Sequence, residues 1–196
     1  ILNYLGVWET IAPNSTPIAN IHVSCEGAFG QLNFEPDEKS KNIGVIADLI
    51  ALQVAFKQRL KQHNSLLKGR FIGLEHLDVP HLVHAEIAQK PAIIRAKWVI
   101  AADGAMSAVR QACRLPVESG KEQIAYLSRI QLKTPHQGLA YERFTDRGPL
   151  ALLPWGTHEM AMVWSCLRPY DLLEISEAFK KQLGSRLGHF DWLGPI

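Results

Sequence analysis

Hydrophobic and polar residues alternate along several short segments of the chain, and this two-residue period predicts β-strands. In residues 18–23, the apolar positions Ala19, Ile21 and Val23 fall on one face. The other predicted strands are residues 31–34, 71–77, 82–87, 92–95, 124–132, 139–144, 150–153 and 160–165. Residues 155–158 read Trp-Gly-Thr-His, which predicts a turn that joins the last two strands into an antiparallel hairpin.

Helical periodicity appears in two places. Residues 46–63 carry Leu49, Leu52, Phe56 and Leu60 at helical spacing, with basic residues toward the end of the segment. A second helix is predicted at residues 176–187, where Gly188 supplies a C-terminal cap.

A continuous apolar run, Trp-Val-Ile-Ala-Ala at residues 98–102, ends in Asp103 and Gly104. Such a run is typical of a buried strand in a parallel sheet, so we predict a strand here and a helix beginning near Met106. Ligands of open α/β sheets bind beyond the carboxyl ends of strands. Gly104 allows close backbone approach, Asp103 can accept hydrogen bonds, and Arg110 can pair with an anion. A purely structural turn is the alternative.

Composition excludes several classes of protein but does not identify a function. The chain has 196 residues, 47 % of them apolar and 20 % charged, as in ordinary globular proteins. The net charge of +2 and the lack of a basic stripe argue against a nucleic-acid partner. Three well-separated cysteines fit a reducing compartment. No apolar run approaches the roughly 18 residues of a membrane span. We expect both ends to be cuts inside a longer protein, a processed mature chain being the alternative.

The β texture before and after a strand–helix–strand middle predicts a mixed α/β fold in which the flanking strands join one sheet. The histidines His76, His81 and His84 suggest a metal site only weakly. The spacing in a strand puts His81 and His84 on opposite faces, and no cysteine or carboxylate cluster joins them.

The sequence carries a family resemblance at several places together. Asp103-Gly104-x-x-Ser107-x-x-Arg110, after its apolar run, resembles the Asp-Gly motif of the class A flavoprotein monooxygenases, the para-hydroxybenzoate hydroxylase family. Residues 141–154 closely resemble the substrate-domain segment of that family's ubiquinone-pathway ring hydroxylases, and residues 162–165 are similar to the strand that follows it there. Residues 43–60 resemble the helix that reaches the flavin. The resemblance extends from about residue 21 to the end of the chain.

This resemblance implies a portion of a Rossmann-like FAD-binding domain at residues 35–118 and a β-sheet-rich substrate domain at residues 1–34 and 119–196. It implies an enzyme that hydroxylates a prenylated phenol in ubiquinone biosynthesis with FAD, NAD(P)H and O2. Asp103, Gly104 and Arg110 would contact the cofactor. The residues implied to line the space between substrate and flavin are Gly148, Pro149, Leu150 and Pro154. Asp48 would lie near the flavin, unless it is an ordinary first-turn helix carboxylate. No catalytic acid or base is implied.

Two family motifs are absent: the Gly-x-Gly-x-x-Gly turn that holds the flavin pyrophosphate, and the later Gly-Asp motif. We therefore expect FAD in the full-length enzyme but not in this chain alone. A hydroxylase of another aromatic compound and a non-catalytic β-sheet binding module are the alternatives. We expect a cytoplasmic protein. Peripheral attachment to the inner membrane, membership of a ubiquinone-biosynthesis complex and self-association of the chain stay open.

Overall fold

The fold is known from a computed structural model that describes residues 1–63, 66–75, 79–120 and 122–185. The described chain divides into two compact units. One consists of residues 1–59 and 122–185, and the other of residues 60–120. Each unit is described by itself. The mixed α/β class predicted from the sequence is confirmed.

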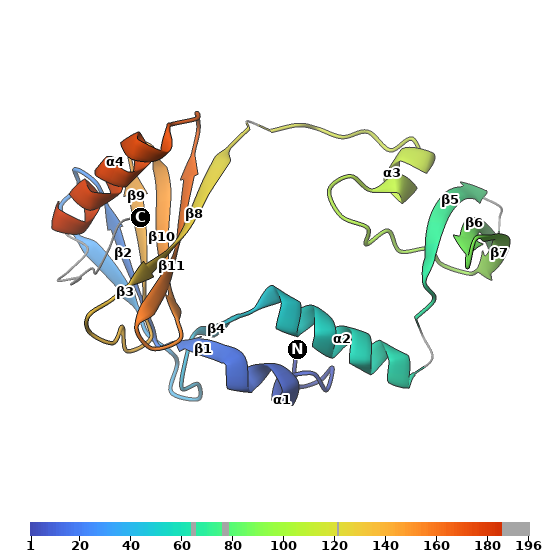
Figure 1. Ribbon diagram of the computed structural model, residues 1–196, viewed down its shortest axis with the longest axis horizontal. Coiled ribbons are helices and arrows are strands. Elements are labelled where there is room, and N and C mark those ends of the chain that lie inside the picture. Colours follow the sequence, from blue (N-terminus) through green and yellow to red (C-terminus); the bar gives the residue numbers. More distant parts are fainter. Residues whose placement is uncertain (64–65, 76–78, 121, 186–196) are drawn as a thin grey trace. The chain divides into compact units, whose positions relative to one another are not determined.

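A six-stranded sheet dominates the first unit, with the strand order β3-β2-β9-β10-β11-β8 (Figure 1). Its strands are β2 (Asn20–Cys25), β3 (Gln31–Phe34), β8 (Ile124–Gln131), β9 (Leu139–Thr145), β10 (Gly148–Trp155) and β11 (Glu159–Cys166). Every pair is antiparallel except β2 and β9, which run parallel. The prediction that strands from both ends of the chain share one sheet is confirmed.

The predicted hairpin is also confirmed. β10 and β11 pair with Leu150 opposite Trp164 and Trp155 opposite Glu159. Gly156 takes a φ of +58° in the turn between them, a conformation that favours glycine. Buried and half-buried residues alternate along both strands, so the two faces of the sheet have different surroundings.

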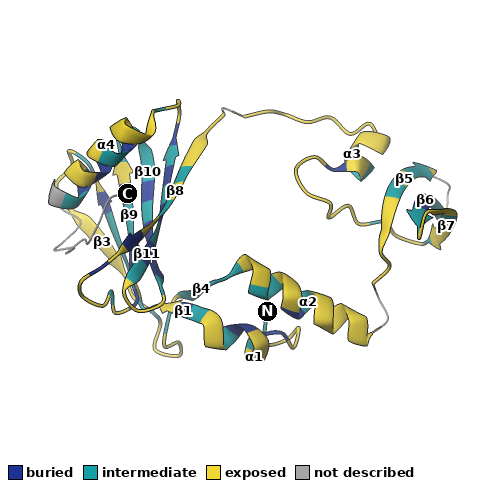
Figure 2. Ribbon diagram, viewed as in Figure 1, coloured by how far each residue is buried: buried dark blue, intermediate teal, exposed yellow. Residues whose placement is uncertain are grey.

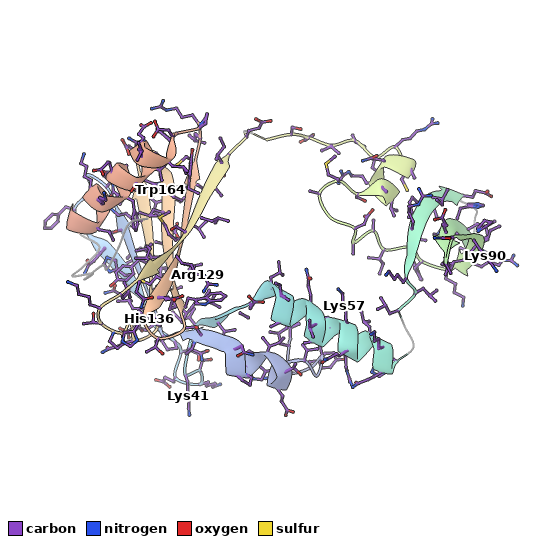
Figure 3. The ribbon with its side chains drawn as sticks, viewed as in Figure 1. Lys41, Lys57, Lys90, Arg129, His136 and Trp164 are labelled. Carbon is purple, nitrogen blue, oxygen red and sulfur yellow. The ribbon has the colours of Figure 1, made fainter. Side chains whose placement is uncertain are left out.

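Helix α4 (Leu172–Ser185) covers one face of this sheet (Figure 2). Ile175 and Phe179 of the helix pack against apolar side chains of β8, β10 and β11. Phe179 meets Trp164, labelled in Figure 3, edge to face at 6.5 Å between ring centroids, and both are fully buried. Each such side chain contributes roughly 1.5–3 kcal/mol through burial, so this is the main core of the unit. The helix starts four residues before the predicted 176, and Gly188 lies outside the described residues.

The rest of the first unit is a smaller assembly around a second core of Val7, Ile11 and Ala55. It comprises α1 (Trp8–Ile11), the 3-10 helix η1 (Ala12–Asn14), and a two-stranded sheet of β1 (Ser15–Ile18) with β4 (Gly44–Ala47). It also includes α2 (Leu49–Gln62) as far as Arg59; the last three residues of this helix belong to the other unit. The prediction that α2 starts at residue 46 is wrong. Asp48 accepts hydrogen bonds from the backbone N–H groups of Ile50 and Ala51, which makes it the N-cap, and the apolar residues before it form β4.

The second unit holds a three-stranded antiparallel sheet, β5 (Gly69–Glu75), β6 (His81–Ile87) and β7 (Lys90–Ala96), and the short helix α3 (Ala108–Ala112). These strands overlap the predicted residues 71–77, 82–87 and 92–95, of which residues 76 and 77 lie outside the described part of the chain. The predicted buried strand at residues 98–102 is wrong: the segment is not a strand, and Trp98 and Ile100 are 85 % and 87 % exposed. A parallel strand exists only when neighbours hydrogen-bond with it, and no described strand does so here.

Candidate functional site: the open sheet face and the Asp103 turn

The face of the six-stranded sheet opposite α4 is rich in apolar side chains, and we call it the open face. Strand register places Val23, Phe144, Pro149, Ala151 and Leu153 on it. Large apolar side chains at its edges are exposed to solvent, among them Leu32 at 64 %, Phe34 at 52 % and Leu127 at 73 %. Exposed apolar surface of this kind marks a site for a ligand or another protein surface.

A hollow of about 450 Å³ lies where β2, β3 and β9 meet. Its lining is mostly apolar and comprises Val23, Ser24, Cys25, Gly30, Gln31, Leu32 and Phe144. A volume in this range suits a small organic ligand.

The structure separates the four residues implied to line the substrate space. Leu150 is fully buried in the core beneath α4, and Pro154, on the same face of β10, is also buried. Strand alternation turns these two side chains away from the open face. Pro149 has the opposite orientation and lies on the open face beside Phe144. The same face also carries Ala151 and Leu153.

Gly148 begins β10 with a φ of +133°. A Cβ atom at this position would overlap the backbone carbonyl oxygen of Ser165 on β11. Glycine is therefore required here for two reasons, the backbone conformation and the close approach of a neighbouring strand. This fixes the position of Pro149 at the edge of the open face.

Glu142 is the acidic residue in the middle of this apolar surface. It lies opposite Ala151 on β10 and opposite Val23 on β2. Its side chain is half-buried, and no hydrogen bond or ion pair joins its carboxylate to any other described residue. Burial raises the pKa of the Glu142 carboxyl.

The next residue, Arg143, points to the opposite face and is 3 % exposed. Its Nε donates to Gln182 Oε1 on α4 at 2.7 Å, and its Nη1 donates to Ser24 Oγ on β2 at 3.1 Å. Gln182 Nε2 in turn donates to Glu26 Oε1 at 2.9 Å. The hydrogen bond from Gln182 lowers the pKa of Glu26, assisted by the Asp146 backbone N–H and the Arg143 charge. This network ties α4 to β2 and β9.

In the second unit, Ser107 is the N-cap residue of α3, and the Asp103 carboxylate accepts further hydrogen bonds at the start of this helix. One oxygen accepts the Ser107 hydroxyl, and the other accepts the backbone N–H groups of Ala108 at 2.7 Å and Val109 at 3.2 Å. These hydrogen bonds, the one from Ser107 first, lower the pKa of Asp103. Both oxygens are thus engaged within the turn, so Asp103 holds the shape of the turn.

Two features of the same turn suit a cofactor. Gly104 takes a φ of +90° and is exposed, which leaves its backbone open to a ligand. Arg110 donates through Nη2 to the Ala105 carbonyl at 2.6 Å, whereas its Nε is buried and has no hydrogen-bond partner among the described residues. An unpartnered buried donor on a charged side chain fits the oxygen atoms of an anionic group such as a flavin pyrophosphate.

Comparison with known families decides the family. Residues 75–183 match a family described as FAD binding domain, which is more than half of the chain. The chain belongs to this family. Its Asp103 turn and its sheet face are therefore parts of a flavoprotein fold, and the matched residues come from both units.

Curated relatives share this region. The chain is 29 % identical over 205 residues to the ubiquinone hydroxylase UbiL of Rhodospirillum rubrum, covering 100 % of this chain and 47 % of that protein. It is 28 % identical to the 3-demethoxyubiquinol 3-hydroxylase of Escherichia coli, covering 96 % and 51 %. It is 33 % identical to the mitochondrial ubiquinone biosynthesis monooxygenase COQ6 of Danio rerio, covering 90 % and 40 %. The chain thus spans about half the length of these relatives or less.

Solved structures agree on the fold. The p-nitrophenol 4-monooxygenase PnpA of Pseudomonas putida superposes with a TM-score of 0.67 at 14 % identity, over 93 % of this chain and 49 % of that one. The flavin-dependent halogenase CmlS gives 0.66 at 14 % identity, over 98 % and 39 %. At such low identity these matches establish the fold of FAD-dependent enzymes and nothing finer.

The sequence pattern predicts the strand that holds Glu142 and Arg143 but indicates no role for either residue. A polar residue in an alternating strand reads as solvent-facing, and only the register shows that Glu142 has apolar neighbours on both adjacent strands. Within the described residues, no helix is long and apolar enough to cross a bilayer.

Proposed function

We propose that the full-length protein is an FAD-dependent monooxygenase that hydroxylates a prenylated phenolic ring in ubiquinone biosynthesis. The observation that carries the proposal is the similarity, along almost the whole chain, to three proteins whose names state ubiquinone hydroxylation or ubiquinone biosynthesis monooxygenation. Membership of the FAD binding domain family supports the cofactor. NADH or NADPH is the proposed reductant, and O2 supplies the oxygen atom.

The Asp103 turn is the proposed flavin contact of this chain. Bound FAD supplies the redox chemistry, namely reduction by the nicotinamide and activation of O2. Gly104 offers an exposed backbone, and Arg110 offers a buried donor that no described residue occupies. Asp103 keeps the turn in shape through its three hydrogen bonds.

The open face of the sheet is the proposed substrate side. A ring with a prenyl tail needs apolar surface, which Val23, Phe144, Pro149 and Leu153 supply, and the adjacent hollow of about 450 Å³ has the same character. A prenylated substrate partitions into lipid at roughly 0.8 kcal/mol for each buried CH2 group. We therefore expect the full-length protein to work at a membrane surface.

The test uses the purified full-length flavoprotein with a panel of phenols that differ only in the prenyl tail. We expect NADH or NADPH oxidation that depends on the phenol, a product with one additional ring hydroxyl, and a kcat/KM that rises with tail length. A reaction that is indifferent to the tail, or that prefers an unprenylated aromatic acid, would show that the enzyme serves another aromatic substrate. No product with any phenol would contradict the proposal.

A further inference from the structure

On the basis of the proposed function, we infer that the Glu142 carboxylate accepts the hydrogen bond of the substrate's phenolic hydroxyl and takes its proton. The geometry points to this residue because it is the acid at the centre of the open face. It projects from β9 between Val23 of β2 and Ala151 of β10. A phenol that lies with its ring on this face places its hydroxyl within reach of the carboxylate.

The apolar surroundings of Glu142 have a cost for the folded protein. A carboxylate that loses water gains stability only if hydrogen-bond donors replace it, and no described residue donates to Glu142. Arg129, the basic residue on β8, is paired with Glu159 at 3.2 Å and stacks on Trp155 instead. A half-buried acid without a partner, in a surface that suits a ligand, is the pattern of a group whose partner is the ligand.

The proposed step is a single proton transfer from the phenol to Glu142. The phenol O–H bond breaks, the proton bonds to one Glu142 oxygen, and the electron pair stays on the phenolic oxygen. The products are a neutral carboxylic acid and a phenolate, so charge and atoms balance. A phenolate ring is richer in electrons than a phenol and is attacked more readily by an electrophilic oxygen donor. Burial raises the pKa of Glu142, which makes it a stronger base for this step.

The titratable groups near Glu142 on its own face are few. Among the described residues of β2, β9 and β10, the other ionisable side chain on that face is the Cys25 thiol, opposite Phe144. His22, Tyr141 and Arg143 belong to the face that α4 covers. A pH response of phenol binding that Glu142→Gln abolishes is therefore assigned to Glu142 and not to Cys25.

The experiment measures binding and stability of the full-length holoenzyme, with no turnover. The ligands are a prenylated phenol and its O-methyl ether, which cannot donate a hydrogen bond. We expect the wild-type protein to bind the phenol about tenfold to a hundredfold more tightly than the ether, as a hydrogen bond to a charged group allows. In the wild type, this phenol-to-ether ratio should fall as the pH is lowered and Glu142 becomes protonated. Glu142→Gln should lower the ratio about tenfold or more and make it independent of pH.

The matched control is Glu159→Gln, which removes a carboxylate on the same face whose charge is already paired with Arg129. It should leave the phenol-to-ether ratio unchanged. Thermal unfolding gives a second readout. If Glu142 had only a structural role, its replacement would lower Tm, whereas an unpartnered half-buried carboxylate predicts an unchanged or higher Tm for Glu142→Gln near pH 7.

An unchanged phenol-to-ether ratio in Glu142→Gln would overturn the inference while leaving the proposed function intact, provided that the wild type prefers the phenol. A wild type that binds neither ligand would refute the proposed function and, with it, the inference. Reduced Tm together with an equal loss of affinity for both ligands would show a structural residue and would also overturn it.

Discussion

The buried network around Arg143 allows a sharp test of how α4 is held on the sheet. The perturbation is Arg143→Met, which keeps most of the apolar stem and removes the guanidinium. Two hydrogen bonds are lost, to Gln182 Oε1 and to Ser24 Oγ, and both acceptors are buried. The pairing is unusual because a cation that is 3 % exposed bonds only to neutral side chains among the described residues.

The magnitude follows from opposing terms. A hydrogen bond from a charged donor contributes about 1.5–3 kcal/mol, and Arg143→Met removes two of them. Removing the buried charge recovers part of its desolvation cost. We therefore expect a net loss of about 2–4 kcal/mol in the free energy of unfolding. For a chain of this size, that lowers Tm by roughly 4–16 °C.

The assay is guanidinium denaturation followed by tryptophan fluorescence, since Trp164 is fully buried in the core that α4 covers. Lys180→Met is the control on the same helix, because it breaks an exposed ion pair with Glu177. That pair is worth about 0.3–0.5 kcal/mol. If the Arg143→Met midpoint matches that of Lys180→Met, the network does not hold α4 in place.

Further expectations concern glycine geometry, acid stability and flavin binding. Gly148→Ala should destabilise the first unit far more than Gly156→Ala, because an added methyl overlaps the neighbouring strand at Gly148 and meets open space at Gly156; equal urea midpoints would contradict this. The lowered pKa of Glu26 stabilises the fold at pH values above the ordinary pKa near 4.5, and this stabilisation is lost as the pH falls through the folded-state pKa. The difference in unfolding free energy between wild type and Glu26→Gln should therefore shrink when denaturation is measured at lower pH. A difference that stays constant with pH would count against this. In the full-length protein, Asp103→Ala should reduce flavin content or slow flavin reduction, measured by absorbance and stopped flow, with little change in global Tm; normal flavin behaviour would remove Asp103 from the site. The 196-residue chain alone should be purified without FAD, since it has no Gly-x-Gly-x-x-Gly turn; a stoichiometric visible flavin spectrum would disprove this.

The sequence predicts those helices and strands whose hydrophobic pattern and turn residues lie within the segment itself. The β10–β11 hairpin is one example, since strict alternation and a glycine turn define both its register and its inward face. Residues 98–102 are the opposite case. Their apolar pattern is that of a buried strand, but a buried strand depends on hydrogen-bonding neighbours, and local sequence says nothing about whether those neighbours are present.

The candidate site also has one part that the sequence predicts and another part that only the structure reveals. The motif at Asp103, Gly104 and Arg110 is visible in the sequence. The structure adds that Asp103 accepts hydrogen bonds at the start of α3, while the Arg110 Nε is not bonded to any described residue. The side of β10 that is available to a ligand can be identified only from the pairing register of the strands. Leu150 and Pro154 belong to the core, and Glu142 becomes a candidate because of the strands beside it.

The fate of molecular oxygen distinguishes a monooxygenase from any other flavoprotein. The full-length flavoprotein is supplied with a prenylated phenol, NADH or NADPH and isotopically labelled O2, and the product is examined by mass spectrometry. We expect a ring-hydroxylated product that carries one labelled oxygen atom for each nicotinamide oxidised. A product without the label, or oxidation of the nicotinamide with no hydroxylated ring, would contradict it.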